Sequence, residues 1–328
     1  MERRRIGRTD LMASTLGFGG GPIGNLRRAI SDLDAETVLD AAWTAGIRYF
    51  DTAPLYGLGR SELRLGAFLR CRPRDEFVLA TKVGRLLVPS PGGNIETHGF
   101  VDIPPFAVTY DYSHDGALRS IEASLARLRL DRIDIALVHD IDGRTHGPAQ
   151  PARFDEALSG AWRALVRLKA EGVVGAIGLG VNEWQVCRDW ALRAEPDLFL
   201  LAGRYTLLEQ APAAEFLPLC RERGISLVIG GPYNTGILVT GPVPGAWYNY
   251  APATPEILER VRQIEAVLRR YDVPLPAAAL QFPLQEPAVA TVIPGLMSPA
   301  EVATTVAAMS HDVPDAAWND LRSAGLIV

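Results

Sequence analysis

The stretch Tyr49-Phe50-Asp51-Thr52-Ala53-Pro54-Leu55-Tyr56-Gly57 has a form that the rest of the chain repeats: a short apolar run, then polar residues and a loop. The apolar run predicts a buried strand, and the Pro and Gly after it predict the loop that leaves the strand. Asp51 then ends the strand, and Tyr56 lies on the loop. By itself this stretch is ordinary, because an Asp at the end of a strand is usually a turn former.

Similar apolar runs alternate with helical patterns along the whole chain. Apolar residues at helical spacing, as at Leu118, Ile121, Leu125 and Leu128, separate one run from the next. Eight such units in succession predict parallel strands that close into a (β/α)8 barrel, the TIM-barrel type of α/β fold. We expect strands at 15–19, 47–51, 77–82, 133–139, 176–180, 198–202, 226–229 and 290–293.

A doubly wound parallel sheet is the alternative arrangement. It requires a G-x-G-x-x-G turn that opens a helix after the first strand. Gly17-Phe18-Gly19-Gly20-Gly21 does not have that spacing, so the barrel is preferred. We also expect a β-hairpin around Arg8-Thr9-Asp10 and an extra helix over 315–324. Since no change of composition marks a linker, residues 1–328 are expected to form one domain.

Composition excludes several classes of protein. The net charge of −5 gives no basic surface for nucleic acid. No run approaches the ~18 apolar residues of a membrane helix, and no apolar signal-peptide core follows Arg3-Arg4-Arg5. Cys71, Cys187 and Cys220 are odd in number and widely spaced, which favours neither disulfides nor a metal site. We expect a cytoplasmic protein that binds neither nucleic acid nor membrane.

The predicted strand ends carry a reactive set of side chains. In such a barrel, functional residues lie where the strands end. Asp51 ends the second strand with Tyr56 beyond it, Lys82 ends the third and His139 ends the fourth. Asp51 would hold Lys82 charged, and that ammonium is expected to lower the Tyr56 pKa from about 10. Tyr56 would then exchange a proton with an alcohol or carbonyl oxygen that His139 orients, while a nicotinamide cofactor exchanges hydride.

This set resembles the catalytic tetrad of the aldo-keto reductases. Four further stretches are similar to the D-threo-aldose (L-fucose) 1-dehydrogenases of that family. Pyridoxal 4-dehydrogenase and L-galactose dehydrogenase are close relatives of these enzymes. The four stretches are 110–116, 138–142, 202–210 and 231–236. The resemblance implies NAD(P)-linked oxidation of the C1 hydroxyl of an aldose to the lactone. It also implies a small-molecule partner and a monomer or homodimer.

The resemblance places the dinucleotide at the loops after the seventh and eighth strands, the usual phosphate region of such barrels. Glycines there would let backbone amides approach a pyrophosphate, although a flexible surface loop explains them as well. Asn182 corresponds to the residue that holds the nicotinamide amide. The other expected cofactor-binding residues are Gly230, Gly231, Pro232, Asn234 and Gly236 in the first loop, and Pro294, Gly295, Met297 and Glu301 in the second.

The second loop favours NAD over NADP. Relatives that use NADP usually place Arg or Lys near the position of Met297, and residues 296–309 contain neither. A 2′-phosphate needs such a partner. Ser298 and Glu301 also match a capping box with Pro299 at the first helical position, which accounts for Glu301 as well as a cofactor role does.

Substrate selection is expected from the loops at 83–113, 141–153 and 232–254. Their aromatic residues suit a neutral polyol, although loop packing explains them equally well; they are Tyr110, Tyr112, Trp247, Tyr248 and Tyr250. Pyridoxal oxidation and carbonyl reduction stay open as alternatives. So do a lyase with a Schiff base on Lys82 and a nucleotide-sensing partner subunit without activity.

Overall fold

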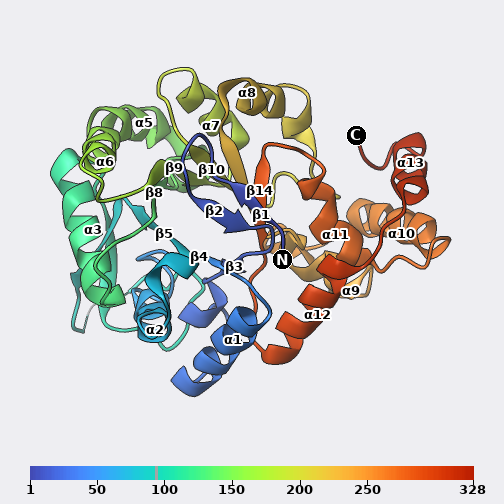
Figure 1. Ribbon diagram of the computed structural model, residues 1–328, viewed down its shortest axis with the longest axis horizontal. Coiled ribbons are helices and arrows are strands. Elements are labelled where there is room, and N and C mark those ends of the chain that lie inside the picture. Colours follow the sequence, from blue (N-terminus) through green and yellow to red (C-terminus); the bar gives the residue numbers. More distant parts are fainter. Residues whose placement is uncertain (93–94) are drawn as a thin grey trace.

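The computed structural model describes residues 1–92 and 95–328. Eight parallel strands form one sheet in the order β3-β4-β5-β8-β9-β10-β11-β14, surrounded by helices (Figure 1). Parallel bridges join Leu16 to Val292 and Gly19 to Gly295, so the first and last strands meet and the sheet closes. The predicted (β/α)8 barrel is confirmed.

The elements have the following bounds. The barrel strands are β3 (Phe18–Gly19), β4 (Tyr49–Asp51), β5 (Val78–Val83), β8 (Ile135–His139), β9 (Ala176–Val181), β10 (Leu198–Ala202), β11 (Ser226–Gly230) and β14 (Val289–Ile293). Outside the barrel sheet lie β1 (Arg3–Arg5), β2 (Met12–Ser14), β6 (Arg85–Pro89), β7 (Phe106–Tyr110), β12 (Trp247–Tyr248) and β13 (Ala251–Pro252). The helices are α1 (Asp32–Thr44), α2 (Arg60–Leu69), α3 (His114–Leu128), α4 (Gly143–His146), α5 (Gln150–Ser159), α6 (Ala161–Ala170), α7 (Trp184–Ala191), α8 (Phe216–Arg223), α9 (Ile237–Thr240), α10 (Pro255–Arg269), α11 (Leu275–Leu284), α12 (Pro299–Ser310) and α13 (Asp315–Ser323). Single 3-10 turns lie at η1 (Pro22–Gly24), η2 (Arg74–Glu76), η3 (Gly147–Ala149), η4 (Ala211–Ala213) and η5 (Asn234–Gly236).

The predicted N-terminal hairpin closes the end of the barrel at which the strands begin. β1 and β2 pair antiparallel and lie across the barrel centre in Figure 1. Ile6 and Ala13 are fully buried in the cluster that fills the barrel interior. The Ser14 hydroxyl accepts a hydrogen bond from the backbone N–H of Arg48, which precedes β4. The interior is therefore sealed at this end, and the site lies at the other.

The segment predicted as one long irregular loop, 83–113, instead contains a β-hairpin. β6 and β7 pair antiparallel from Arg85 opposite Tyr110 to Pro89 opposite Phe106. The many Pro and Gly residues of this segment are typical of a loop and hid the pairing. Among its described Pro and Gly residues, Pro89 is the one that lies in a paired strand. The apolar side chains of this hairpin pack with Leu55 and Leu58, next to Tyr56.

Two apolar stripes with helical spacing, at 158–165 and at 257–268, depart from a simple alternation of one helix with each strand. The stripe at 158–165 belongs to two helices, α5 and α6, because Gly160 breaks them apart where its backbone meets Tyr112. The stripe at 257–268 is α10, which packs on α13 and α11, whereas α11 is the helix that covers β14. Pro276 and Pro283 made α11 unrecognisable. Pro276 lies in the first turn, where a proline is tolerated, whereas Pro283 lies inside the helix, next to its last residue. None of the described helices combines the length and the apolar character needed to cross a bilayer.

We expect replacement of Gly66 to destabilise the barrel wall. Gly66 lies on α2, and a Cβ there would clash with the Leu128 carbonyl oxygen at the end of α3. Gly66→Ala would normally stabilise a helix, but here overpacking should lower the free energy of unfolding by about 1–3 kcal/mol. Urea denaturation followed by circular dichroism measures this change.

Gly21→Ala is the matched control. Gly21 also has helical backbone angles, but only one side-chain atom, 3.9 Å away, lies near its added Cβ. This variant should match or slightly exceed the parent in stability. Equal stabilities of the Gly66→Ala variant and the parent would contradict the close approach of α2 and α3.

Candidate active site

Strand alternation puts three polar side chains on top of the apolar barrel interior. Side chains two residues apart in a strand face the same side. Tyr49, Ala80 and Leu137 belong to the buried interior cluster, and two positions further along the same strands come Asp51, Lys82 and His139. These three therefore face inward at the carboxyl ends of β4, β5 and β8, where barrel enzymes carry their active sites.

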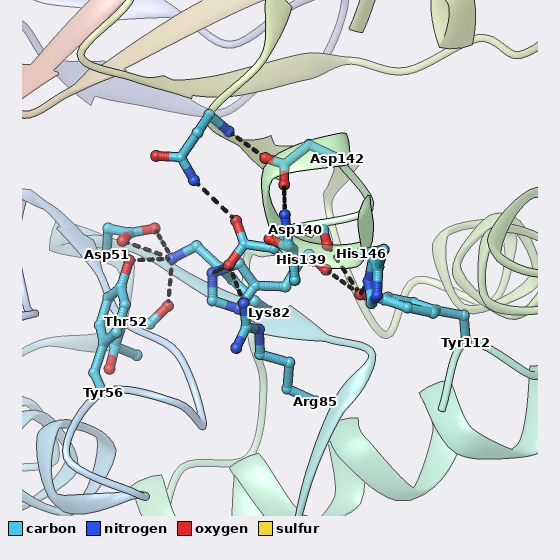
Figure 2. Close-up of polar contacts among 12 residues, drawn as sticks. Asp51, Thr52, Tyr56, Lys82, Arg85, Tyr112, His139, Asp140, Asp142 and His146 are labelled. Carbon is cyan, nitrogen blue, oxygen red and sulfur yellow. Dashed lines mark hydrogen bonds and ion pairs between the residues drawn. The ribbon is translucent and has the colours of Figure 1, made fainter. Parts of the chain in front are cut away.

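Lys82 and Asp51 form a buried ion pair at this end of the barrel. The Lys82 Nζ lies 2.9 and 2.7 Å from the two Asp51 carboxylate oxygens and donates to the Thr52 carbonyl at 2.8 Å (Figure 2). The two side chains are only 1% and 2% exposed. Gly180 on β9 leaves the space that the lysine occupies, since a Cβ there would lie 3.1 Å from the Lys82 Cε.

Tyr56 reaches the same ammonium from the loop after β4. Its Oη lies 3.3 Å from the Lys82 Nζ, and the His139 ring stands edge-on to its ring with centroids 6.1 Å apart. Its loop is held by Gly57, whose positive φ of 64° lets its backbone lie against Gly24. The structure thus brings all four predicted tetrad residues together, and their catalytic roles stay predictions.

The electrostatics of the site differ from the expectation in one respect. Burial raises the pKa of Tyr56 well above its usual value, and the carboxylates of Asp51 and Asp140 raise it further. The net shift is therefore upward, opposite to the expected lowering, because burial outweighs the nearby cations. Tyr56 is therefore a neutral phenol at neutral pH.

His139 is neutral as well. Burial lowers the pKa of His139 well below its usual value, and the cations of Arg85 and Lys82 act in the same direction. A neutral imidazole can orient an oxygen by hydrogen bonding without carrying charge into the site.

Two charged residues of the site, Arg85 and Asp140, escaped the sequence-based prediction. The Arg85 Nη2 lies 2.6 Å from the Asp140 Oδ2, which lies 3.3 Å from the His139 Nε2. In the sequence, only their positions could have indicated that these two residues belong to the site. Asp140 follows His139 directly, and Arg85 comes three residues after Lys82. Burial raises the pKa of Asp140 to about 6, with Arg85 opposing the shift.

The five aromatic residues predicted to face substrate have three kinds of environment. Tyr112 and Tyr248 are bonded to protein: the Tyr112 Oη donates to the His139 carbonyl at 2.8 Å, and the Tyr248 Oη donates to a Glu209 carboxylate oxygen. Trp247 and Tyr250 are partly exposed and lie against the guanidinium groups of Arg27 and Arg144. Tyr110 flanks Arg85, with its ring centroid 5.0 Å from the guanidinium carbon.

The predicted pyrophosphate loop follows β11 directly. Gly230 ends β11, Pro232 follows Gly231, and Asn234 and Gly236 bound the η5 turn. The φ angles of Gly231 and Gly236 are 58° and 103°, a region that favours glycine. A Cβ at Gly231 would meet only one atom, at 3.9 Å, and a Cβ at Gly236 would meet none within 4 Å.

The second predicted loop is held by hydrogen bonds within the chain. The Pro294 carbonyl accepts from Gly19, and Gly295 packs against Pro22 so closely that a Cβ would clash. The Ser298 hydroxyl caps α12, as predicted, by accepting from the Glu301 N–H at 3.2 Å. The Glu301 carboxylate, however, accepts from Met297 N–H at 2.7 Å, where a capping box would have it bond the backbone of Ser298.

Asn182 lies directly after β9, beside the tetrad. Its backbone N–H donates to Asp142 at 2.8 Å, and its side-chain Nδ2 donates to Asp140 at 3.3 Å. The Asn182 carbonyl accepts a hydrogen bond from the Arg204 Nε at 3.0 Å, and the Gly203 carbonyl accepts one from the Arg204 Nη1. Arg204 therefore adds a positive charge between Asn182 and the start of the loop after β10.

These residues fit a dinucleotide. The open space over Gly231 and Gly236 lets a phosphate approach the backbone there, although the Gly236 N–H already donates to the Tyr233 carbonyl at 2.9 Å. Arg204 adds a guanidinium, which lies 3.7 Å from a Glu209 carboxylate oxygen. Asn234 is buried, and within the part of the chain that the structure describes its Oδ1 has no hydrogen-bond partner. A bound molecule with a hydrogen-bond donor would satisfy that oxygen.

Comparisons with known proteins agree with this geometry. The aldo/keto reductase family model matches residues 15–325. The chain is 42% identical to pyridoxal 4-dehydrogenase of Microbacterium luteolum, covering 99% of this chain and 98% of that protein. It is also 42% identical to D-threo-aldose 1-dehydrogenase of a Pseudomonas species, covering 97% and 95%.

Among solved structures, the holo form of an aldo-keto reductase from Bacillus halodurans superposes with a TM-score of 0.78 at 28% identity, covering 100% of this chain and 97% of that one. The barrel, the arrangement at the ends of its strands and these matches agree. The chain belongs to the aldo/keto reductase family, whose members use nicotinamide cofactors.

Proposed function

We propose that this chain is an NAD-linked dehydrogenase that oxidises the C1 hydroxyl of an aldose, such as L-fucose or another D-threo-aldose, to the lactone. The observation that carries the proposal is the contact of Tyr56 with a buried ammonium, Lys82, next to the ring of His139. We also propose that residues 1–328 are one domain, since the hairpin packs on β14 and α13 on α10.

Each tetrad residue has a distinct task in this proposal. Tyr56 takes the proton of the substrate hydroxyl, and His139 orients the same oxygen. Lys82 stabilises the phenolate that Tyr56 must become, and Asp51 keeps Lys82 charged and in place. When bound, the oxidised nicotinamide accepts the hydride that leaves C1.

The contacts of Lys82 favour this function over a lyase. A Schiff base needs a neutral amine that substrate can reach. The Lys82 Nζ is instead an ion-paired donor to Asp51 and Thr52, and its side chain is 1% exposed.

Pyridoxal oxidation is the second candidate, because the pyridoxal 4-dehydrogenase relative is as similar as the aldose dehydrogenase. Carbonyl reduction uses the same tetrad in reverse. A screen of aldoses, pyridoxal and simple ketones, followed by NADH absorbance, separates these activities. Turnover of pyridoxal with no turnover of any aldose would replace the first candidate with the second.

We predict that Tyr56→Phe removes turnover and leaves NADH binding almost intact. The change deletes only the oxygen that exchanges the proton, so kcat should fall by at least about 100-fold. Tyr271→Phe is the control, since it also removes one hydroxyl, bonded to Asp320 at 2.6 Å in the α10–α13 region. A Tyr56→Phe variant with most of the parent activity would show that another group transfers the proton.

The raised pKa of Tyr56 predicts a pH dependence for the oxidation. A base acts in its deprotonated form, and the fraction of phenolate grows about tenfold per pH unit below the pKa. The kcat/KM for oxidation should therefore rise steeply from neutral to alkaline pH. Carbonyl reduction needs the protonated phenol and should show no such rise. An oxidation rate that is independent of pH between 7 and 9 would contradict the role of Tyr56 as the base.

We predict a preference for NAD of at least about tenfold in kcat/KM, because a 2′-phosphate would lack a charged hydrogen-bond partner. Residues 296–309 contain no Lys or Arg, and Glu301 lies beside Met297. Met297→Arg should shift the preference toward NADP. Ala303→Arg adds the same charge further along α12 and should not. A parent enzyme that prefers NADP would overturn the cofactor assignment.

A further inference from the structure

The Asp140 carboxylate connects three parts of the proposed site. Its Oδ2 accepts from the Arg85 Nη2 at 2.6 Å and lies 3.3 Å from the His139 Nε2. Its Oδ1 accepts from the Asn182 Nδ2 at 3.3 Å. Figure 2 shows Asp140 close to both Arg85 and His139. These neighbours come from β6, β8 and the residue after β9, so one side chain links three segments.

The backbone at Asp140 is built for this contact. Its φ of 47° is left-handed, which costs free energy for a residue other than glycine. The Asp140 N–H donates to the Gly180 carbonyl at 2.9 Å, and the Tyr112 Oη lies 3.2 Å from the Asp140 carbonyl. Strand alternation would turn this side chain away from that of His139. The left-handed turn keeps both on the same side.

The charges of Arg85 and Asp140 depend on each other. Their side chains are 6% and 11% exposed, so either charge alone would be poorly solvated. With Arg85 in contact, the Asp140 carboxyl is ionised above about pH 6. An ionised carboxylate only accepts hydrogen bonds.

Because the Asp140 carboxylate only accepts hydrogen bonds, it determines the orientation of the Asn182 side-chain amide. An amide side chain can present either its oxygen or its nitrogen to a ligand. Because Asp140 accepts and cannot donate, the Asn182 Nδ2 must face it. The Asn182 Oδ1 is then left to accept a hydrogen bond, as the NH2 group of a carboxamide requires.

We propose that Asp140, clamped by Arg85, is a positioning residue that presents the Asn182 oxygen to the carboxamide of the nicotinamide. The proposal rests on the cofactor use described under the proposed function. It assigns to Arg85 and Asp140 a role in cofactor recognition beyond the four tetrad residues.

Asp140→Asn tests the proposal with almost no change of shape. Arg85 needs an acceptor, so the new amide oxygen should face Arg85 and the new NH2 should face Asn182. Two NH2 groups cannot bond each other, so the Asn182 amide must turn over. We expect the NADH dissociation constant, titrated by fluorescence without substrate, to rise about tenfold, or about 1.4 kcal/mol.

A double-mutant cycle separates positioning from general damage. In an Asn182→Ala background, the Asp140→Asn change should alter the NADH dissociation constant by less than about twofold, because the amide through which it acts is gone. Equal effects in the two backgrounds would overturn the proposal.

Exchange of the two residues provides a rescue. Asn182→Asp alone places two carboxylates together and should weaken NADH binding strongly. Adding Asp140→Asn restores a donor opposite an acceptor and leaves a carboxylate oxygen to accept from the carboxamide. The exchange variant should therefore bind NADH more tightly than Asn182→Asp alone. Failure to recover any affinity would count against the proposal.

Asp134→Asn is the matched control. Asp134 precedes β8 at the opposite end of the barrel, is 8% exposed, and pairs with Arg74 at 2.8 Å. Its replacement should reduce thermal stability and leave the NADH dissociation constant unchanged. NADH binding by the parent without coupling between positions 140 and 182 would overturn this inference alone. A parent that binds no NADH would overturn the proposed function with it.

Discussion

The buried ion pair of Asp51 and Lys82 is the constraint on which the site depends. Removing two charges from water costs several kcal/mol for each ion, and the cost is offset only when the geometry is good and the remaining donors are satisfied. Here both carboxylate oxygens, the Thr52 carbonyl and the Tyr56 hydroxyl surround one ammonium. The Tyr56 hydroxyl lies against the ammonium that this pair holds in place, and the lysine side chain fits because Gly180 has no side chain.

The two ends of the barrel use acidic residues for different purposes. At the closed end, an Asp134 carboxylate oxygen accepts from the Leu79 N–H at 2.7 Å, and an Asp197 oxygen accepts from the Ile177 N–H at 2.9 Å. Each carboxylate tethers the start of one strand to its neighbour. Both carboxylates also pair with a cation, Asp134 with Arg74 and Asp197 with Lys169. At the open end the Asp51 and Asp140 carboxylates accept from side chains of the site, Lys82, Arg85 and Asn182. Stability is thus concentrated at one end, which leaves the other available for chemistry.

Sequence patterns predicted the barrel well because its strands are continuous apolar runs, buried on both faces. All eight strands, the hairpin at the N-terminus and the gathering of Asp51, Tyr56, Lys82 and His139 followed from strand order. Strand order carries no information on pairing within a loop, so the β6–β7 hairpin was missed. Helix α11 was missed for a similar reason. Its prolines are typical of a loop, and whether a helix tolerates a proline depends on the position of that proline within the helix.

Strand order did not predict the electrostatics of the site. The direction of the Tyr56 pKa shift depends on how burial compares with the charges around the phenol, and that comparison needs coordinates. Asp140 could not be placed either, because period-two alternation turns a residue after His139 outward. A single left-handed φ reverses that direction. The cofactor residues Asn182, Gly231 and Gly236 keep their status as predictions, supported by open space and by the fit of their donors and acceptors. Glu301 also stays a prediction, with its carboxylate bonded to the Met297 N–H.

The ion pairs of the lysines also determine how the protein responds to amine chemistry. The chain has lysines only at positions 82 and 169, and each is bound to the carboxylate of an aspartate, Asp51 or Asp197. Lys169 is 36% exposed, whereas Lys82 is hidden within the barrel. An amine-selective label or crosslinker would therefore meet Lys169 and the N-terminal amine, and the group at the centre of the site would be shielded. This surface, which carries its positive charge almost entirely on arginine, offers such a reagent few points of attachment.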